Sequence, residues 1–498
     1  MKTIRFFATT TTFLSLTCAL LGCSKNTGGG GGGGGKNTGG SGTTTTTTTY
    51  VKTQVKMWLT DADQSQLLNR QNIALNFSTS TNSNTTINVD STTTYQTIDG
   101  FGFALTDGSA QVINGLTSSV NASLIHELFA PDSTGIGISY LRVTIGASDM
   151  SAEAFTYDDM PAGSTDPNLT SFSISPDETD LIPTLKKILA VNPNIKILAC
   201  PWTAPVWMKT NTIGNGGFEG GSLNPVYYQA YANYFVKYIQ AMTAAGINIT
   251  AVTPQNEPLN AYNTPAMLMQ DTAEAVFIGQ YLGPAFHSAG LSTKIICYDH
   301  NCDQPNYPVY VLNNSTANPY VDGSAFHLYA GDISALSTVH TAFPNKNLYF
   351  TEQATFSTGT FAGDLNWHVT NLIVGATLNW SKNVLEWNLA SDGNYGPHTV
   401  GGCSTCQGAV TIASSTSFTR NVSYYIVAHA SKFVKPGAVR IASDVSTNLP
   451  NVAFQNTDGS KVLIVLNATG NTQTFNIKFN SKIITSTLSS GAVATYTW

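Results

Sequence analysis

Glutamates that end apolar stretches are the first candidates for chemistry in this chain. Only 10% of its 498 residues are Asp, Glu, Lys or Arg, against about 25% in typical soluble domains. Glu257 nevertheless lies in "TPQNEP" (253–258), directly after the apolar and β-branched run "INITAV". Glu352 in "LYFTEQ" and Glu386 in "NVLEWN" follow similar runs. Paired carboxylates can cleave a glycosidic bond, one as proton donor and the other as nucleophile.

Spacing alone does not select two of these three glutamates. A glutamate at a strand end can also serve only as an ion-pair partner, and Arg142 is the candidate partner for Glu257. Pro258 is expected to hold Glu257 in extended backbone and to direct its side chain toward the strand ends. Pro254 would remove a hydrogen-bond donor from a central strand, so we expect that strand to deform there.

Eight short apolar runs are the elements that must position these side chains. They are too short and too uniformly apolar for surface helices and are typical of buried parallel strands. Segments between them have helical periodicity, as in residues 225–242, where Tyr231, Tyr234 and Tyr238 share one face. Strands alternating with helices predict an α/β fold, a (β/α)₈ TIM barrel. The runs are residues 97–106, 138–146, 195–202, 249–257, 294–300, 323–329, 347–353 and 383–390.

The segments on either side of the barrel are rich in Thr, Val and Asn and look strand-like. The C-terminal part has the turn signals "NTDGS" and "NATGN" between alternating runs, which predicts an antiparallel meander. We expect the N-terminal strands to join it in one antiparallel β-sandwich. The predicted domains are residues 50–95 for the N-terminal strands, 96–428 for the catalytic barrel and 429–498 for the C-terminal sandwich.

Polar and aromatic side chains gather where the predicted strands end, which is where the active site of such a barrel lies. Aromatic residues beside paired carboxylates suit a sugar substrate. The sequence has no glycine-rich phosphate loop and no convincing metal cluster, so we expect neither a cofactor nor a metal. The residues at the strand ends are Asp107, Arg142, Trp202, Asn256, Glu257, Asp299, His300, His327, Tyr329, Glu352 and Trp387.

The N-terminus indicates export. In residues 1–22, Lys2 and Arg5 precede an apolar stretch too short for a membrane span, and "LLGC" ends at Cys23, as in a bacterial lipoprotein signal. An ordinary cleaved signal peptide is the alternative. Residues 23–49 are rich in Gly and Thr, so we expect a flexible tether. The protein is therefore expected outside the cytoplasm, at the outer membrane or cell surface, attached only through a lipid on Cys23.

Cysteines and charge narrow the partners further. "CSTC" gives Cys403 and Cys406 a spacing that zinc sites and local disulfides both use; only His398 is near as a further ligand, so a disulfide is favoured. Cys297 and Cys302 are a second candidate pair. The net charge is −6 with scattered basic residues, which argues against nucleic-acid binding. We expect a monomer.

These stretches together resemble glycoside hydrolase family 30, which contains glucosylceramidases and microbial endo-β-1,6-glucanases. The resemblance covers the chain after residue 50, and the family fold is a (β/α)₈ barrel with a side β-sandwich. The motifs that carry it are "GFGFALTD" (100–107), "ILACPWTAPVWMKTN" (197–211), "QNEP" (255–258), "FTEQ" (350–353) and "EWNLA" (386–390).

The resemblance implies that Glu257 is the general acid/base and Glu352 the nucleophile, which leaves Glu386 a supporting role. The acid should then carry the raised pKa while the nucleophile is ionised. Phe103 stands where glucosylceramidases have glycine, and it is expected to narrow the pocket. A loop that caps a helix is the alternative for "DHN" (299–301). The implied substrate-binding residues are Asp107, Trp202, Asn256, Asp299, His300, His327, Tyr329 and Trp387.

The implied function is hydrolysis of β-glucosidic bonds through a glycosyl-enzyme intermediate. "TIGASDMS", "FTYDD", "QNEPLN" and "YDHNCD" look more like endo-β-1,6-glucanases than glucosylceramidases. Loops 298–307 and 391–398 are polar with interspersed Tyr, which favours a glucan over a ceramide leaving group. The alternatives are a glucosylceramidase-like β-glucosidase and a glycan-binding surface lipoprotein without catalysis.

Overall fold

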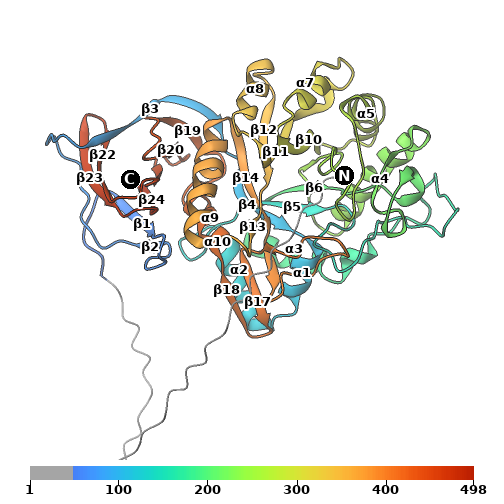
Figure 1. The fold of residues 1–498 in the computed structure, drawn as a ribbon, viewed down its shortest axis with the longest axis horizontal. Helices are drawn as coiled ribbons and strands as arrows, with labels where there is room; N and C mark the ends of the chain where they lie inside the picture. Colours follow the sequence, from blue (N-terminus) through green and yellow to red (C-terminus); the bar gives the residue numbers. More distant parts are fainter. Residues whose placement is uncertain (1–48) are drawn as a thin grey trace, which may run out of the picture. The chain divides into compact units, whose positions relative to one another are not determined.

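A computed structural model describes residues 49–498 of the chain (Figure 1). The predicted lipoprotein signal, Cys23 and the tether up to residue 48 lie outside the described residues. In the described part of the chain, no helix is both long enough and apolar enough to cross a membrane.

Eight parallel strands close into a barrel, as the alternation of apolar runs with helical segments predicted. Consecutive barrel strands pair along the chain, and the last closes on the first. Nearly all of their residues are buried, because helices cover the outside and side chains fill the interior. The strands are β4 (Gly100–Leu105), β5 (Tyr140–Thr144), β6 (Lys196–Cys200), β9 (Ala251–Val252), β10 (Lys294–Cys302), β11 (Val321–Gly331), β12 (Asn347–Glu352) and β14 (Ser381–Asn388).

Helices follow the barrel strands and bury one apolar face each. In α4, Tyr231, Tyr234 and Tyr238 are fully buried, as their shared face predicted. Two segments, η5 (Ile278–Leu282) and η7 (Val369–Ala376), are π-helical. The α-helices are α1 (Asp107–Asn114), α2 (Ser118–Phe129), α3 (Leu181–Val191), α4 (Tyr228–Ala244), α5 (Asp271–Phe277), α6 (Gly283–Ser288), α7 (Asn306–Asn313), α8 (Ala335–Ala342), α9 (Phe361–His368) and α10 (Val422–Ser431).

A nine-stranded sheet of N-terminal and C-terminal strands stands beside the barrel and carries its own apolar core (Figure 1). The long strand β3 pairs antiparallel with β19 and parallel with β22, so the N-terminal strands join the C-terminal meander as expected. In sheet order the strands are β2 (Asn69–Arg70), β1 (Lys56–Thr60), β24 (Val493–Thr497), β21 (Lys461–Leu466), β20 (Asn451–Gln455), β19 (Val439–Ser443), β3 (Thr85–Thr97), β22 (Gln473–Phe479) and β23 (Lys482–Leu488).

Three small sheets form in the loops that follow barrel strands. The hairpin of β7 (Lys209–Thr212) and β8 (Gly220–Leu223) follows β6. A two-residue strand, β13 (Thr355–Phe356), follows β12 and pairs with β16 (Cys406–Gln407). The third sheet consists of β15 (Ala390–Asp392), β17 (Val410–Ser414) and β18 (Ser417–Arg420).

The barrel interior is layered because side chains alternate between the two faces of a strand. One buried cluster inside the barrel is apolar apart from two tyrosine hydroxyls: Tyr140, Leu198, Ala251, Ile296, Ala325, Tyr349 and Leu385. Two residues further along six of these strands comes a second, mostly polar layer: Arg142, Cys200, Thr253, His327, Thr351 and Trp387.

Strand β10 breaks this alternation. Its pairing register shifts between Tyr298 and His300, and Tyr298 and Asp299 have the left-handed backbone angles φ 78° and φ 68°. This bulge inserts one residue, so that Asp299 rather than Tyr298 enters the polar layer. Strand β9 also ends early, at Val252, in agreement with the deformation expected at Pro254.

Candidate active site

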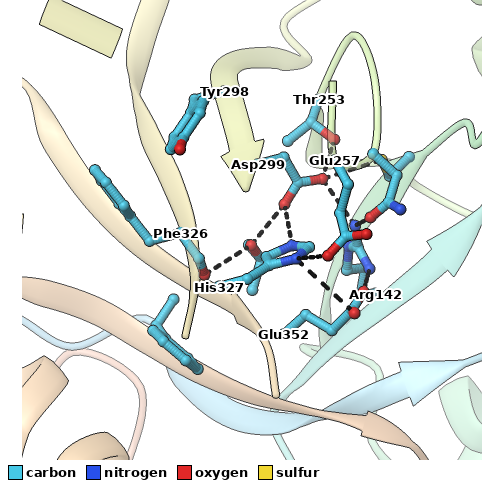
Figure 2. A network of polar contacts seen from close by, with 12 residues as sticks. Arg142, Thr253, Glu257, Tyr298, Asp299, Phe326, His327 and Glu352 are labelled. Carbon is cyan, nitrogen blue, oxygen red and sulfur yellow. Dashed lines mark hydrogen bonds and ion pairs between the residues drawn. The ribbon is translucent and has the colours of Figure 1, made fainter. Parts of the chain in front are cut away.

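The Asp299 carboxylate lies at the centre of the polar layer (Figure 2). Burial would raise the pKa of Asp299, but Arg142 and His327 hold it well below its usual range. Asp299 is fully buried and is not among the residues that line the cavity, because the bulge places it beneath the site. Its donors are Arg142 Nη2 (2.8 Å), Thr253 Oγ1 (2.7 Å), Cys200 Sγ (3.0 Å), Thr351 Oγ1 (2.6 Å) and His327 Nε2 (3.1 Å).

Arg142 is the buried cation of the site. Its Nη1 donates to Glu352 Oε2 at 2.6 Å, and its Nη2 donates to the Asn256 side-chain oxygen at 2.7 Å. The guanidinium also lies 4.8 Å from the ring centre of Trp202, within cation–π range. Arg142 therefore pairs with Glu352 rather than Glu257, so the ion-pair alternative for Glu257 is wrong.

Glu352 and Glu257 reach the pocket by different backbone routes. Glu352 is the last residue of β12, and Tyr329 donates its hydroxyl to Glu352 Oε1 at 3.0 Å. Glu257 has a left-handed backbone with φ 42°, so the extended conformation predicted from Pro258 is wrong. Its N–H donates to the carbonyl of Asp299 at 3.0 Å, which ties the turn to the β10 bulge.

His327 lies between the two glutamates (Figure 2). Its Nδ1 is 3.3 Å from Glu257 Oε1 and 3.9 Å from Glu352 Oε1. One oxygen of Glu257 and one of Glu352 lie within 4.8 Å of each other. Retaining glycosidases hold their carboxyl groups about 5–5.5 Å apart, whereas inverting enzymes need about 6.5–9.5 Å to admit a water molecule. The spacing is that of the retaining class.

The pKa values of the pair are the reverse of the prediction. Burial would raise the pKa of Glu257, but the hydrogen bond and charge of His327, with help from His300 and Asn260, lower it to about 2. Burial raises the pKa of Glu352 despite the charges of His327 and Arg142. The pKa of His327 itself is raised, against burial, by the surrounding carboxylates to about 9. His327 favours ionised Glu257 because it lies closer to Glu257 in the substrate-free site.

Glu386, the third candidate, faces away from the barrel interior. It follows the inward-facing Leu385 on β14 and accepts from His368 Nδ1 of α9 at 2.7 Å. Phe103 is likewise fully buried in the large apolar core that packs the helices against the barrel. It does not line the pocket, so the expected narrowing by Phe103 is wrong. Alternation on β4 puts Ala104, its neighbour, beside the site.

A cavity of about 440 Å³ opens over the two glutamates. Five residues of the predicted set line it, whereas Trp202, Asn256 and His327 lie behind that surface. The Trp202 ring packs 5.3 Å from the ring of Trp387, and its Nε1 has no partner in the described part of the chain. The lining residues are Asp149, Glu257, Leu259, Asn260, Asn263, His300, Asn301, Tyr329, Glu352, Phe356, Trp387, Cys403 and Cys406.

Asp149 is the main functional candidate that the strand-end criterion missed. It lies five residues after β5, in "GASDMS", and burial with the nearby glutamates raises its pKa to about 7. Asp107 was predicted in its place. That residue begins α1, accepts a hydrogen bond from the Ser151 hydroxyl and is absent from the pocket lining. Asp107 therefore stays a predicted substrate-binding residue that the cavity lining does not include.

Cys403 and Cys406 form the favoured disulfide. Cys297 and Cys302 are free and buried, so their proposed pairing is wrong. Glu257, His327 and Glu352 have the proximity of metal ligands. However, both ring nitrogens of His327 already have carboxylate partners, Nδ1 with Glu257 at 3.3 Å and Nε2 with Asp299 at 3.1 Å. The set fits carboxylate chemistry better than a metal site.

The chain matches the family model of the glycosyl hydrolase family 30 TIM-barrel domain over residues 98–434 and that of the family's beta sandwich domain over residues 437–496. It is 39% identical to an endo-1,6-beta-D-glucanase of Aspergillus fumigatus, over 76% of this chain and 79% of the relative. It is 31% identical to the lysosomal acid glucosylceramidase of Mus musculus, over 81% of each chain.

A solved endo-beta-1,6-glucanase structure superposes with a TM-score of 0.83 and 36% identity, covering 90% of this chain and 99% of that one. The two family models together span the barrel with its glutamate pair and the C-terminal strands of the sandwich. The chain therefore belongs to glycosyl hydrolase family 30.

Proposed function

We propose that the protein is a retaining endo-β-1,6-glucanase. The observation that carries the reaction class is the pair of carboxylates, Glu257 and Glu352, with oxygens within 4.8 Å under one cavity. The support for the glucan comes from relatives, since three endo-1,6-beta-D-glucanases are 37–39% identical to this chain over 76% of its length.

In the first step, Glu352 attacks the anomeric carbon while the bond from that carbon to the leaving oxygen breaks. Arg142 and Tyr329 hold one Glu352 oxygen each, at 2.6 and 3.0 Å, which fixes the direction of attack. The leaving oxygen needs a proton from Glu257. We assign this proton to the hydrogen-bonded pair of His327 and Glu257, with 3.3 Å between Nδ1 and Oε1: it passes from His327 to Glu257 and on to the leaving oxygen, which leaves His327 neutral and Glu257 a carboxylate.

In the second step, Glu257 acts as a general base. It takes a proton from water while the water oxygen bonds to the anomeric carbon and the ester to Glu352 breaks. Glu257 is a carboxylate at this stage and can accept the proton, which then returns to the neutral His327 ring 3.3 Å away and restores the starting state. Glu352 leaves as a carboxylate and is again held by Arg142.

The two sides of the cavity differ in chemistry. The glycone side has one carboxylate, Asp149, and an aromatic wall, Trp387. The buried Trp202 Nε1 adds a hydrogen-bond donor without a partner in the described part of the chain. Asn260, Asn263, His300 and Asn301 line the side next to Glu257, where the leaving group departs.

Polar groups on the leaving-group side favour a second sugar over ceramide. A glucosylceramidase-like β-glucosidase is the second candidate, supported by the 31% identity to the mouse lysosomal acid glucosylceramidase.

Product analysis separates the two candidates. Purified protein should release mixed oligosaccharides early from linear β-1,6-glucan and leave glucosylceramide largely intact, because an endo enzyme needs sugars on both sides of the cut. A Glu352→Gln preparation, made in parallel, controls for contaminating hydrolases. Rapid ceramide release with an untouched glucan would overturn the glucanase assignment in favour of the second candidate.

We also propose that the enzyme works outside the cytoplasm as a lipoprotein attached through Cys23. A Cys23→Ala variant, expressed in a bacterium with a lipoprotein pathway, should move from the membrane to the soluble fraction with unchanged specific activity. Mass spectrometry of the membrane form should show acyl chains on Cys23. Equal partitioning of the two proteins would count against the anchor.

A further inference from the structure

Loop 399–403 folds directly onto Asp149, the carboxylate on the glycone side of the cavity. The Thr399 N–H donates to the Asp149 carbonyl at 2.9 Å, and the backbone N–H of Cys403 lies near enough to the Asp149 carboxylate to lower its pKa, against the larger rise that burial causes. Gly402 lies so close to the Asp149 carbonyl that a Cβ at this position would collide with it. The loop therefore holds the main chain of Asp149 and places the Cys403 N–H beside its carboxylate.

The Cys403–Cys406 disulfide joins this loop to β16, the short strand that pairs with the segment after the nucleophile. Cys406 begins β16, which pairs with Phe356 of β13, four residues after Glu352. The Ser357 N–H adds a hydrogen bond to the carbonyl of Thr405 at 2.9 Å. The disulfide therefore fixes Cys403, beside Asp149, to Cys406, and strand pairing connects Cys406 by hydrogen bonds to the backbone that follows Glu352.

A local role suits this disulfide better than a global one. It links residues only three apart in sequence, and short loops remove little entropy from the unfolded chain. The loop before it is open, with Val400 82% exposed, so apolar packing does little to hold its tip. Both sulfur residues line the cavity itself, and Cys406 packs in an apolar cluster with Trp202 and Trp387.

We propose that the Cys403–Cys406 disulfide is a positioning element that holds the Asp149 carboxylate against the sugar on the glycone side. This inference rests on the proposed function, because it requires a sugar in the cavity. Loss of the disulfide should weaken recognition of that sugar more than it slows bond cleavage, since neither cysteine contacts the catalytic carboxylates by a hydrogen bond in the described structure.

A double-mutant cycle tests the link to Asp149. We would measure the Kd of deoxynojirimycin, an iminosugar glucose mimic, together with kcat and KM for dinitrophenyl β-glucoside. The proteins are the wild type, Cys403→Ala/Cys406→Ala, Asp149→Asn and the triple variant. Removing the disulfide should raise Kd and KM about 3- to 30-fold in the wild-type background, but less than about 2-fold in the Asp149→Asn background, as coupled neighbours behave.

A reductant on the folded wild type gives a second arm should the double variant fail to fold. Reduction should reproduce the rise in KM in the wild type, whereas the KM of Asp149→Asn, which keeps all the cysteines, should change less than about 2-fold on reduction. An equal loss in both backgrounds, or unchanged Kd on reduction, would overturn the proposal. Absence of iminosugar binding by the wild type would instead count against the glycosidase function.

Discussion

Glu352→Gln is expected to lose more than about 10⁴-fold in kcat on every substrate, including those with activated leaving groups. Glutamine keeps the size of the side chain, and its single oxygen can still accept the hydrogen bond of Arg142, although its NH2 group cannot accept the bond of Tyr329. It cannot form the ester to the anomeric carbon, so no glycosyl-enzyme should appear by mass spectrometry with a fluorosugar that traps the intermediate.

Glu257→Gln should slow the cleavage of some substrates much more than others, depending on whether the leaving group needs a proton. The rate on β-1,6-glucan should fall by about 10²–10⁴-fold, which is the usual contribution of general acid catalysis. Dinitrophenolate leaves without a proton, so glycosylation by dinitrophenyl β-glucoside should remain fast. The intermediate should then accumulate, because water lacks its general base. A burst of dinitrophenol followed by slow turnover is the kinetic sign.

Glu386→Gln is the matched control for both changes. Glu386 is a buried glutamate at the end of a barrel strand, but it is bonded to His368 and lies outside the cavity. Its activity should stay within a few-fold of the wild type. If Glu386→Gln prevented glycosyl-enzyme formation while Glu352→Gln did not, the assignment of the nucleophile would be wrong.

The fold could be predicted because the apolar residues that are buried in strands and helices recur at regular spacings in the sequence. Each barrel strand lies within one of the eight predicted runs, apart from the last few residues of β10 and β11 and the first two of β11 and β14. The tyrosine face of residues 225–242 is buried in α4. The turn signals near the C-terminus likewise separate β20, β21 and β22. Apolar residues that recur every 2 residues in a strand or every 3.6 residues in a helix form a local pattern, so the pattern can be recognised without knowing which elements pack together.

The site was less predictable because it depends on backbone geometry that departs from those periods. Asp299 enters the barrel only through the left-handed residues of the β10 bulge, and Glu257 reaches the cavity from a left-handed turn. Neither position is glycine, so the sequence carries no sign of positive φ. Strand-end position also failed to separate Asp107 from Asp149, because α1 begins immediately after β4 while the chain after β5 runs along the cavity as a loop.

Electrostatics was the least predictable part. The assignment of a raised pKa to Glu257 followed from its expected role, but the pKa depends on whether His327 lies nearer to Glu257 or to Glu352. His327 Nδ1 lies 3.3 Å from Glu257 Oε1 and 3.9 Å from Glu352 Oε1, so it is nearer to Glu257. Glu257 and His327 are 70 positions apart in the sequence, and only the folded barrel brings them into contact.

Arg142→Met is expected to lower the free energy of unfolding by about 3–5 kcal/mol at neutral pH, as removal of one partner from a buried ion pair usually does. Arg142 is fully buried between Asp299 and Glu352, at 2.8 and 2.6 Å. Without it, two carboxylates remain buried with only His327 as a nearby cation. Activity should fall as well, because Glu352 loses the donor that fixes one of its oxygens.

The loss should depend on pH, and its sign follows from the lowered pKa of Asp299. A lowered folded pKa adds stability above the unfolded value, near 4, and that stability disappears as the pH falls through the folded value. In Arg142→Met, the buried carboxyl groups of Asp299 and Glu352 have lost their neighbouring cation, so their pKa values should rise. Protonation at lower pH then removes the unpaired buried charge. The difference from the wild type should therefore be largest near pH 7.5 and smaller near pH 5, as measured by urea unfolding.

Arg440→Met is the matched control, because Arg440 is also buried but stacks 3.5 Å from the Tyr95 ring centre and bonds to Gln96, with no carboxylate partner in the described part of the chain. Its stability loss should come from lost packing and cation–π contact, which do not titrate between these pH values. A pH-independent loss in Arg142→Met, parallel to that of Arg440→Met, would mean that Arg142 acts through packing and that the charge of the Asp299 layer is balanced by other groups.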